Sequence, residues 1–223
     1  ALAEHKDLTI NPKIYVSENP VIQSEYRHVT KNTNSIIDTS FNQGYKNTST
    51  KKTKGSRNHF FAKTNINLNL EKFDESNLDI NLQKVSNDTY LRVHNMSSEL
   101  ITNKTLINSS AELNLLKNDT SLNVNMYVYE DLNKTDDRYE YIVPSYTFRN
   151  KLSYLESFGE FNFVSSGSHK IYETNKDELK IVNDIYWNSN EYINNNGILT
   201  KFEGNLKNAN YNFGIENIYA VCR

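Results

Sequence analysis

The sequence has 223 residues, a net charge of -2 at pH 7 and a pI near 6.3, so it has room for one large domain and no charge excess that favours nucleic acid as a partner. Its mean hydropathy is -0.72 and 37% of its residues are hydrophobic, which would permit partial disorder, but 15 tyrosines and 10 phenylalanines argue against a disordered chain. No run of about 18 apolar residues occurs, which excludes a transmembrane helix.

Alternating residues predict three strands at the start of the chain. Pro12 lies in the first and has no N–H to donate, which predicts an edge strand, a bulged strand or a strand beside a weak seam. Residues 21–30 and 35–43 form the next two predicted strands, and Glu25 and Arg27 share a polar face of the first of these. The apolar face of the opening strand carries Leu8, Ile10, Pro12, Ile14 and Val16.

A long basic connection follows at residues 44–57. The simpler interpretation is a solvated loop. The alternative is a contact with anionic lipid or phosphate groups, for which Lys51, Lys52 and Lys54 are the candidates.

The clearest strand pattern lies between His59 and His94. Residues 62–70 and 77–83 alternate with the period of a strand on either side of a polar turn, which is typical of a hairpin. A third strand is expected to begin at Tyr90, after turn-forming residues. One face of the hairpin carries Ile66, Leu68, Leu78, Ile80 and Leu82, and the other carries Lys63, Asn67 and Asp79. A soluble sandwich also alternates in this way, so the hairpin alone does not say what its apolar face contacts.

Further alternating segments continue to the end of the chain. Residues 105–117 and 121–130 predict two strands joined by a tight connection, and residues 139–150 predict a Tyr-rich strand. Residues 165–176 suggest a polar loop, and a last strand is expected at 198–207. About a dozen strands of about ten residues, with Tyr and Phe near their ends and no convincing amphipathic helix, predict an all-β antiparallel barrel of the outer-membrane type.

The sequence offers no pattern for catalysis, a cofactor or a metal. Its five histidines lack metal-ligand spacing, and nucleotide-binding and hydrolase motifs are missing. Cys222 is the single cysteine, so it cannot form a disulfide within this chain, and we assign it no role. A barrel enzyme that assembles Ser, His and Asn from distant strands, around His94 or His169, stays an alternative. We expect a protein that is not an enzyme.

Four blocks, in this order, resemble the LptD family of outer-membrane lipopolysaccharide-assembly proteins, also called organic solvent tolerance proteins. The blocks are Asp7–Pro12 (DLTINP), Ser24–His28 (SEYRH), Lys84–Leu91 (KVSNDTYL) and Tyr139–Pro144 (YEYIVP). They are short and spread over most of the chain, and their order and spacing carry the resemblance.

The resemblance implies a specific architecture and a set of partners. In that family a periplasmic jelly-roll precedes a large barrel that encloses a plug lipoprotein of the LptE type, receives lipopolysaccharide from the periplasmic Lpt bridge and releases it through a lateral seam. We therefore expect residues 1–223 to be a single barrel segment from the outer membrane of a Gram-negative bacterium, cut from a longer protein and lacking the jelly-roll and the closing strands. Pro12 matches the early strand beside the seam.

The barrel interpretation assigns each side chain to lipid or to a wet lumen. We expect Ile66, Leu68, Leu78, Ile80 and Leu82 to face lipid, and Glu25, Arg27, Lys63, Asn67 and Asp79 to face the lumen. Two alternatives remain. One is a passive porin-like or receptor barrel, and the other is a soluble β-rich adhesin or binding module, which should bury its apolar faces.

Overall fold

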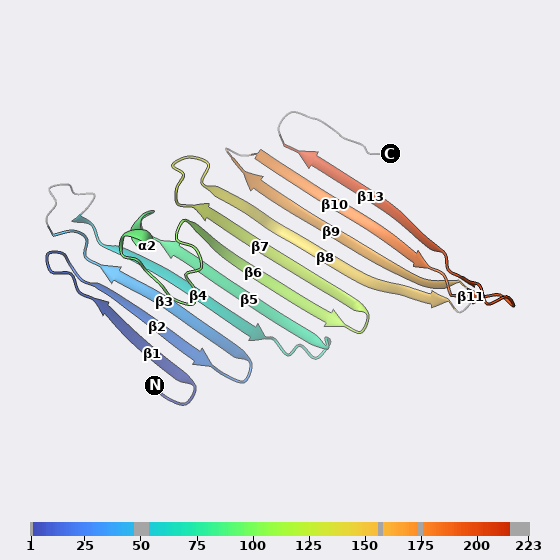
Figure 1. The fold of residues 1–223 in the computed structure, drawn as a ribbon, viewed down its shortest axis with the longest axis horizontal. Coiled ribbons are helices and arrows are strands. Elements are labelled where there is room, and N and C mark those ends of the chain that lie inside the picture. The colour runs from blue at the N-terminus through green and yellow to red at the C-terminus, as the bar shows by residue number, and fades with distance from the viewer. Residues whose placement is uncertain (1, 47–53, 156–157, 174–175, 215–223) are drawn as a thin grey trace. The chain divides into compact units, whose positions relative to one another are not determined.

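The computed structural model describes residues 2–46, 54–155, 158–173 and 176–214, and these residues are almost entirely β-strand. Eleven strands form one sheet in the order β1-β2-β3-β4-β5-β6-β7-β8-β9-β10-β13, so strands that follow one another in sequence are also neighbours in the sheet (Figure 1). This is the up-and-down order expected of an outer-membrane barrel. The sheet is not closed within the described residues, because β1 and β13 are its two ends.

The first strands are β1 (Lys6–Lys13), β2 (Val21–Val29), β3 (Thr33–Asn42), β4 (Arg57–Asn67) and β5 (Glu75–Val85). They are followed by the one-turn helix α2 (Tyr90–Val93), β6 (Leu106–Lys117), β7 (Thr120–Asp131), β8 (Tyr139–Leu155), β9 (Gly159–Tyr172) and β10 (Lys176–Asn188). A two-stranded hairpin, β11 (Tyr192–Ile193) with β12 (Leu199–Thr200), precedes β13 (Glu203–Phe213).

The chain divides into two compact units, which we describe separately. Unit 1 comprises Ala1–Leu68, Asn77–Ala111 and Tyr127–Glu140, and unit 2 comprises Asn69–Ser76, Glu112–Met126 and Tyr141–Arg223. The buried apolar residues of unit 1 form one core: Val21, Phe61, Val85, Tyr90, Leu91, Met96, Leu100, Ile107 and Leu132.

The predicted strands at 105–117 and 121–130 are confirmed as β6 and β7, with a two-residue turn between them. Asn118 in this turn has a φ of 49°, a left-handed conformation that Asn tolerates better than most residues. The predicted hairpin is also confirmed as β4 and β5.

The expected strand at Tyr90 is wrong, because this segment forms α2. The Asn87 side chain accepts a hydrogen bond from the Thr89 N–H at 3.2 Å and so closes a turn that starts the helix. Tyr90 and Leu91 are fully buried against the strands of unit 1. Their burial across the sheet, rather than strand pairing, decides the conformation.

The expected loop at 165–176 is also wrong, since β9 continues to Tyr172. Ser165, Ser166, Gly167 and Ser168 favour turns in isolation, but here they pair with β8 on one side and β10 on the other. Hydrogen bonds on both sides of the strand outweigh the low strand propensity of these residues. The strand expected at 198–207 is instead divided between β12 and β13.

Candidate functional site

The register of β1 to β5 separates the side chains of unit 1 into two faces. Cross-strand partners share a face of an antiparallel sheet, so rows of paired residues define each one. One row runs from Pro12 to Ile22, Phe41 and Asn58. We call its side the aliphatic face, and its exposed members include Leu8, Ile10, Ile22, Phe41, Phe60 and Leu82.

The residues predicted to face lipid lie mostly on the aliphatic face. Ile66 pairs with Leu78, Thr64 with Ile80 and Ala62 with Leu82. Leu68 lies just beyond the end of β4, so strand pairing does not place it. Contact of these side chains with lipid stays a prediction.

The residues predicted to face a lumen lie on the opposite side, which we call the polar face. Glu25 pairs with Asp38, Lys63 with Asn81, and Asp79 with Asn65. Asn67 pairs with Asn77 on the same face. Glu25 and Arg27 both belong to this face, and Nε of Arg27 donates to Oε1 of Glu25 at 2.7 Å.

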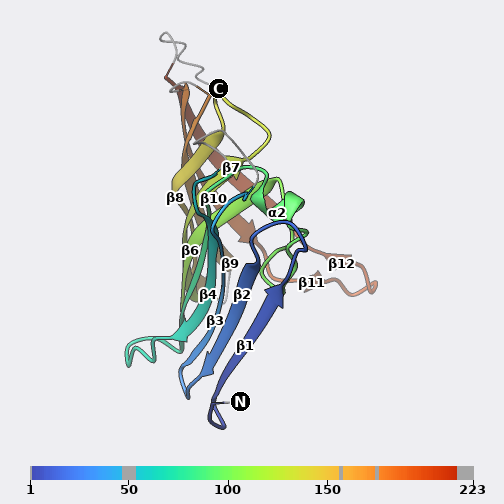
Figure 2. The same ribbon diagram turned by 90° about the vertical axis from the view of Figure 1, so that its left-hand side faces the viewer.

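Residues 86–105, which we call the covering segment, lie over the polar face. Figure 2 shows α2 and its flanking loops standing on one side of β1 to β4. Tyr90, Leu91, Met96 and Leu100 of this segment pack with Val21, Phe61 and Val85 of the sheet. The covering segment therefore buries the part of the polar face that lies beneath it, whereas the aliphatic face stays exposed.

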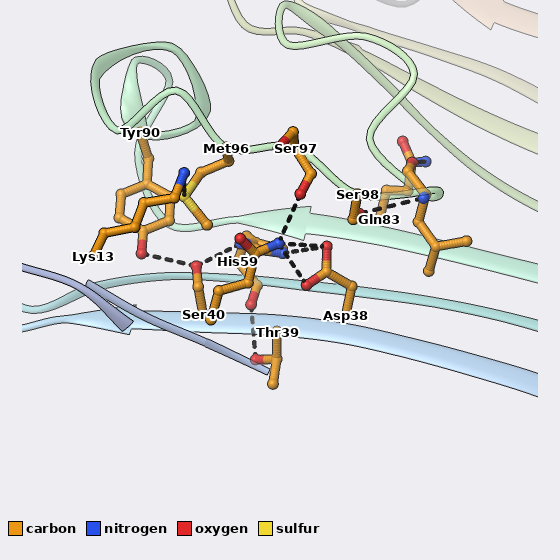
Figure 3. Close-up of polar contacts among 12 residues, drawn as sticks. Lys13, Asp38, Thr39, Ser40, His59, Gln83, Tyr90, Met96, Ser97 and Ser98 are labelled. Carbon is orange, nitrogen blue, oxygen red and sulfur yellow. Dashed lines mark hydrogen bonds and ion pairs between the residues drawn. The ribbon is translucent and has the colours of Figure 1, made fainter. Parts of the chain in front are cut away.

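A buried polar cluster joins the covering segment to β2, β3 and β4 (Figure 3). The Ser40 hydroxyl lies 2.5 Å from Nδ1 of His59 and 2.8 Å from the Tyr90 hydroxyl. Nε2 of His59 lies 3.3 Å from Oδ2 of Asp38, which is ion-pair distance without good hydrogen-bond geometry. The cluster brings together residues from two strands and the helix.

Gln23 of β2 joins this cluster to a second point on the covering segment. Its Nε2 donates to Oδ1 of Asp38 at 3.0 Å and to the main-chain oxygen of Ser97 at 3.2 Å. On the other face of β3, the Thr39 hydroxyl donates to the main-chain oxygen of His59 at 2.9 Å. These bonds satisfy polar groups that burial would otherwise leave unpaired.

The contacts among Ser40, His59 and Asp38 have the order of a nucleophile, a base and an acid. Ser40 is 3% exposed and both other residues are fully buried, so a substrate would have to displace the covering segment to reach them. We interpret the cluster as an anchor for that segment. Sequence reasoning missed it, although Asp38 and Ser40 occupy alternate positions of one strand, a spacing that places two polar groups on one face.

A second set of contacts links the covering segment to the edge strand β1. Nζ of Lys13 donates to the main-chain oxygens of His94 and Asn95, at 3.1 and 2.8 Å. The Tyr15 hydroxyl lies 3.3 Å from Nδ1 of His94. Burial lowers the pKa of His94 below its ordinary value, and the positive charges of Arg57 and Lys13 lower it further.

The other predicted site residues are placed as follows. Pro12 lies in β1 at an end of the sheet, opposite Ile22, which agrees with the edge-strand interpretation. Lys51, Lys52 and Cys222 lie outside the described residues, and Lys54 is exposed. His169 lies 2.5 Å from Asp177 in a partly exposed pair, apart from the buried cluster.

The described part of the chain has no group of three or more His, Cys, Asp and Glu side chains that could hold a metal ion. In the same residues no helix is long and apolar enough to cross a membrane. No protein-family model matches this sequence, and no curated protein matches it.

Proposed function

We propose that this chain is part of an outer-membrane β-barrel that assembles lipopolysaccharide, moving it from the periplasm to the outer leaflet through a lateral opening. The observation that carries the membrane location is the pair of unlike faces on β1 to β5. The aliphatic face is exposed, and the opposite face carries charged and amide side chains. A barrel that separates lipid from a wet lumen needs this division.

The contrast with a soluble module supports the membrane location further. A soluble sheet gains stability by burying its apolar side. In unit 1 the buried apolar core, which includes Val21, Phe61 and Val85, lies on the polar face beneath the covering segment, while Ile10 on the aliphatic face is 60% exposed. Exposed aliphatic residues on neighbouring strands mark a surface made for another apolar phase.

Lipopolysaccharide as the cargo is supported by the four blocks that resemble the LptD family. Three of them fall in unit 1: Asp7–Pro12 in β1, Ser24–His28 in β2, and Lys84–Leu91 where β5 passes into the covering segment. The third block contains Tyr90 and Leu91, which are fully buried. The first block thus lies in the edge strand, and the third reaches into the covering segment held against it.

On this proposal the partners are lipopolysaccharide, outer-membrane lipid, a plug lipoprotein of the LptE type and the periplasmic Lpt bridge. The orientation follows from the connections of unit 1. Residues 43–56 and 86–105 connect strands at one end, and the shorter residues 30–32 connect β2 to β3 at the other. Outer-membrane barrels place longer loops outside the cell and short turns in the periplasm, so the covering segment belongs to the outer end.

The experiment is depletion of the full-length gene product in its native host, followed by an assay of lipopolysaccharide at the cell surface. Surface lipopolysaccharide should fall while it accumulates inside, and expression of the wild-type protein should restore it. Complementation with the Pro12→Ala variant then tests whether Pro12 in the edge strand is needed for the release of lipopolysaccharide. Unchanged delivery after depletion would leave a porin-like or receptor barrel as the better account.

A further inference from the structure

Four residues of unit 1 form one row across the polar face, at the strand ends nearest α2. Lys13 pairs with Val21, Val21 with Asn42, and Asn42 with Arg57. Neighbouring strands lie about 4.8 Å apart, so the two basic residues are roughly 14 Å apart at the backbone. The ammonium group of Lys13 reaches the main-chain oxygens of His94 and Asn95 in the covering segment.

Arg57 is buried at this position without an acidic partner. It is 7% exposed, and its guanidinium lies over the Tyr45 ring, 4.8 Å from the centroid. No carboxylate among the described residues forms an ion pair with it. Asp38 belongs to the same face but lies four residues along β3 from Asn42, roughly 13 Å away. A buried cation without an anion is costly, and an aromatic ring offsets only part of that cost.

His94 lies between the two ends of the row. Its main-chain oxygen accepts a hydrogen bond from Lys13, and the charge of Arg57 is close enough to lower the pKa of its ring. His94 is 8% exposed, and its Nε2 is buried without a hydrogen-bond partner in the described structure. Lys104 adds a fourth basic group, because its Nζ donates to Oδ1 of the adjacent Asn95 at 2.7 Å.

We propose that Arg57 and His94, beside the positive charge of Lys13, form an anion site for a phosphate group of the transported glycolipid, beneath the covering segment. The inference rests on the proposed function and extends it by naming a place where the cargo binds. Arg57 offers a planar fork of N–H donors that matches two phosphate oxygens. The unpartnered Nε2 of His94 offers one further donor when it carries the proton.

The test is a binding measurement on the full-length barrel in detergent micelles. Three probes separate the sources of phosphate: lipopolysaccharide with its phosphate groups, the same glycolipid after enzymatic dephosphorylation, and inorganic phosphate. Arg57→Gln removes the charge, and Arg57→Lys keeps a charge without the fork. Arg92→Gln is the matched control, because Arg92 is exposed in the last turn of α2. Circular dichroism and heat-modified gel mobility confirm that each variant is folded.

The phosphorylated glycolipid should bind Arg57→Gln at least about tenfold more weakly than wild type, with a smaller loss in Arg57→Lys and none in Arg92→Gln. Dephosphorylation should weaken binding to wild type by a similar factor and change binding to Arg57→Gln little. If Arg57→Gln fails to fold, the same comparison is made with His94→Gln.

Equal binding of both glycolipids by wild type and Arg57→Gln would overturn the anion site and leave the proposed function standing. Binding of inorganic phosphate alone, dependent on Arg57, would overturn the glycolipid as its source and count against lipopolysaccharide as the cargo. Binding of none of the three probes would also overturn the site. The depletion assay tests the proposed function independently of this result.

Discussion

Nζ of Lys13 lies 2.8 Å from the main-chain oxygen of Asn95, and this contact joins the last residue of the edge strand to the residue after the C-cap of α2. The same ammonium group also donates to the oxygen of His94, the C-cap residue of α2. A cation at this end of a helix satisfies carbonyl groups that have no partner within the helix. Movement of β1 and movement of the covering segment are therefore coupled through one side chain.

Replacement of Lys13 by Met should release this coupling. The two hydrogen bonds involve a charged donor, so the free energy of unfolding should fall by about 1–2 kcal/mol. Amide exchange in residues 90–96 should accelerate more than exchange in β3. Lys6→Met, at the opposite end of β1, is the control. Equal exchange in the two variants would show that Lys13 does not hold the segment.

Replacement of Ser40 by Ala tests the buried cluster. The change leaves the Tyr90 hydroxyl and Nδ1 of His59 without their shared partner in a buried site, which should cost about 1–3 kcal/mol of unfolding free energy. Ser24→Ala, on the aliphatic face of β2, should change stability by about 0.5 kcal/mol or less. Urea titration in micelles measures both. If Ser40 is instead a nucleophile, the folded wild type should react with a fluorophosphonate, and we expect no reaction.

Stability should depend on pH through His94. Its pKa is lowered in the folded state, so the unfolded chain binds the proton more readily and acidification favours unfolding. The contribution of His94 is fully present above its ordinary pKa of about 6.5 and is lost as pH falls through the lower folded value. Unfolding free energies should therefore rise with pH up to about 6.5 and level off above it. In His94→Gln this part of the slope should disappear; an unchanged slope would assign the dependence to other groups.

An Arg substitution at Ile80 distinguishes a membrane barrel from a soluble sheet. On the lipid side of a barrel it should cost about 2–4 kcal/mol near the bilayer midplane, because the charge loses its hydration. Asn67→Arg, on the polar face, should cost little. The measurement is the unfolding free energy of the full-length barrel in lipid vesicles. Near-neutral effects for both variants would favour a soluble module.

Gly167 in unit 2 should not tolerate a side chain. It lies opposite Tyr146, and an added Cβ would come within 2.5 Å of the tyrosine ring. Gly167→Ala should force that ring away from Ser165, whose hydroxyl lies 3.2 Å from the Tyr146 hydroxyl, at a cost of about 1–3 kcal/mol. Gly55→Ala has open space around its added Cβ and is the control. A similar melting temperature for both variants would contradict the prediction.

Most of the strand pattern follows from local sequence. The alternation around Ile80 and Asn81 depends only on the two-residue period of a strand, and Asn118 marks a turn by its own conformational preference. The assignment of side chains to two faces could therefore be made without a structure.

What only the tertiary structure decided is where the chain leaves that pattern. Tyr90 belongs to a helix because burial on the polar face outweighs strand pairing, and Ser166 belongs to a strand because two neighbours hydrogen-bond to it. Asp38, Ser40 and His59 meet only through the register of β3 with β4, and the charge of Arg57 acts on His94 only because the covering segment folds back across the sheet. These are contacts between residues far apart in the sequence, and neither composition nor periodicity encodes such contacts directly.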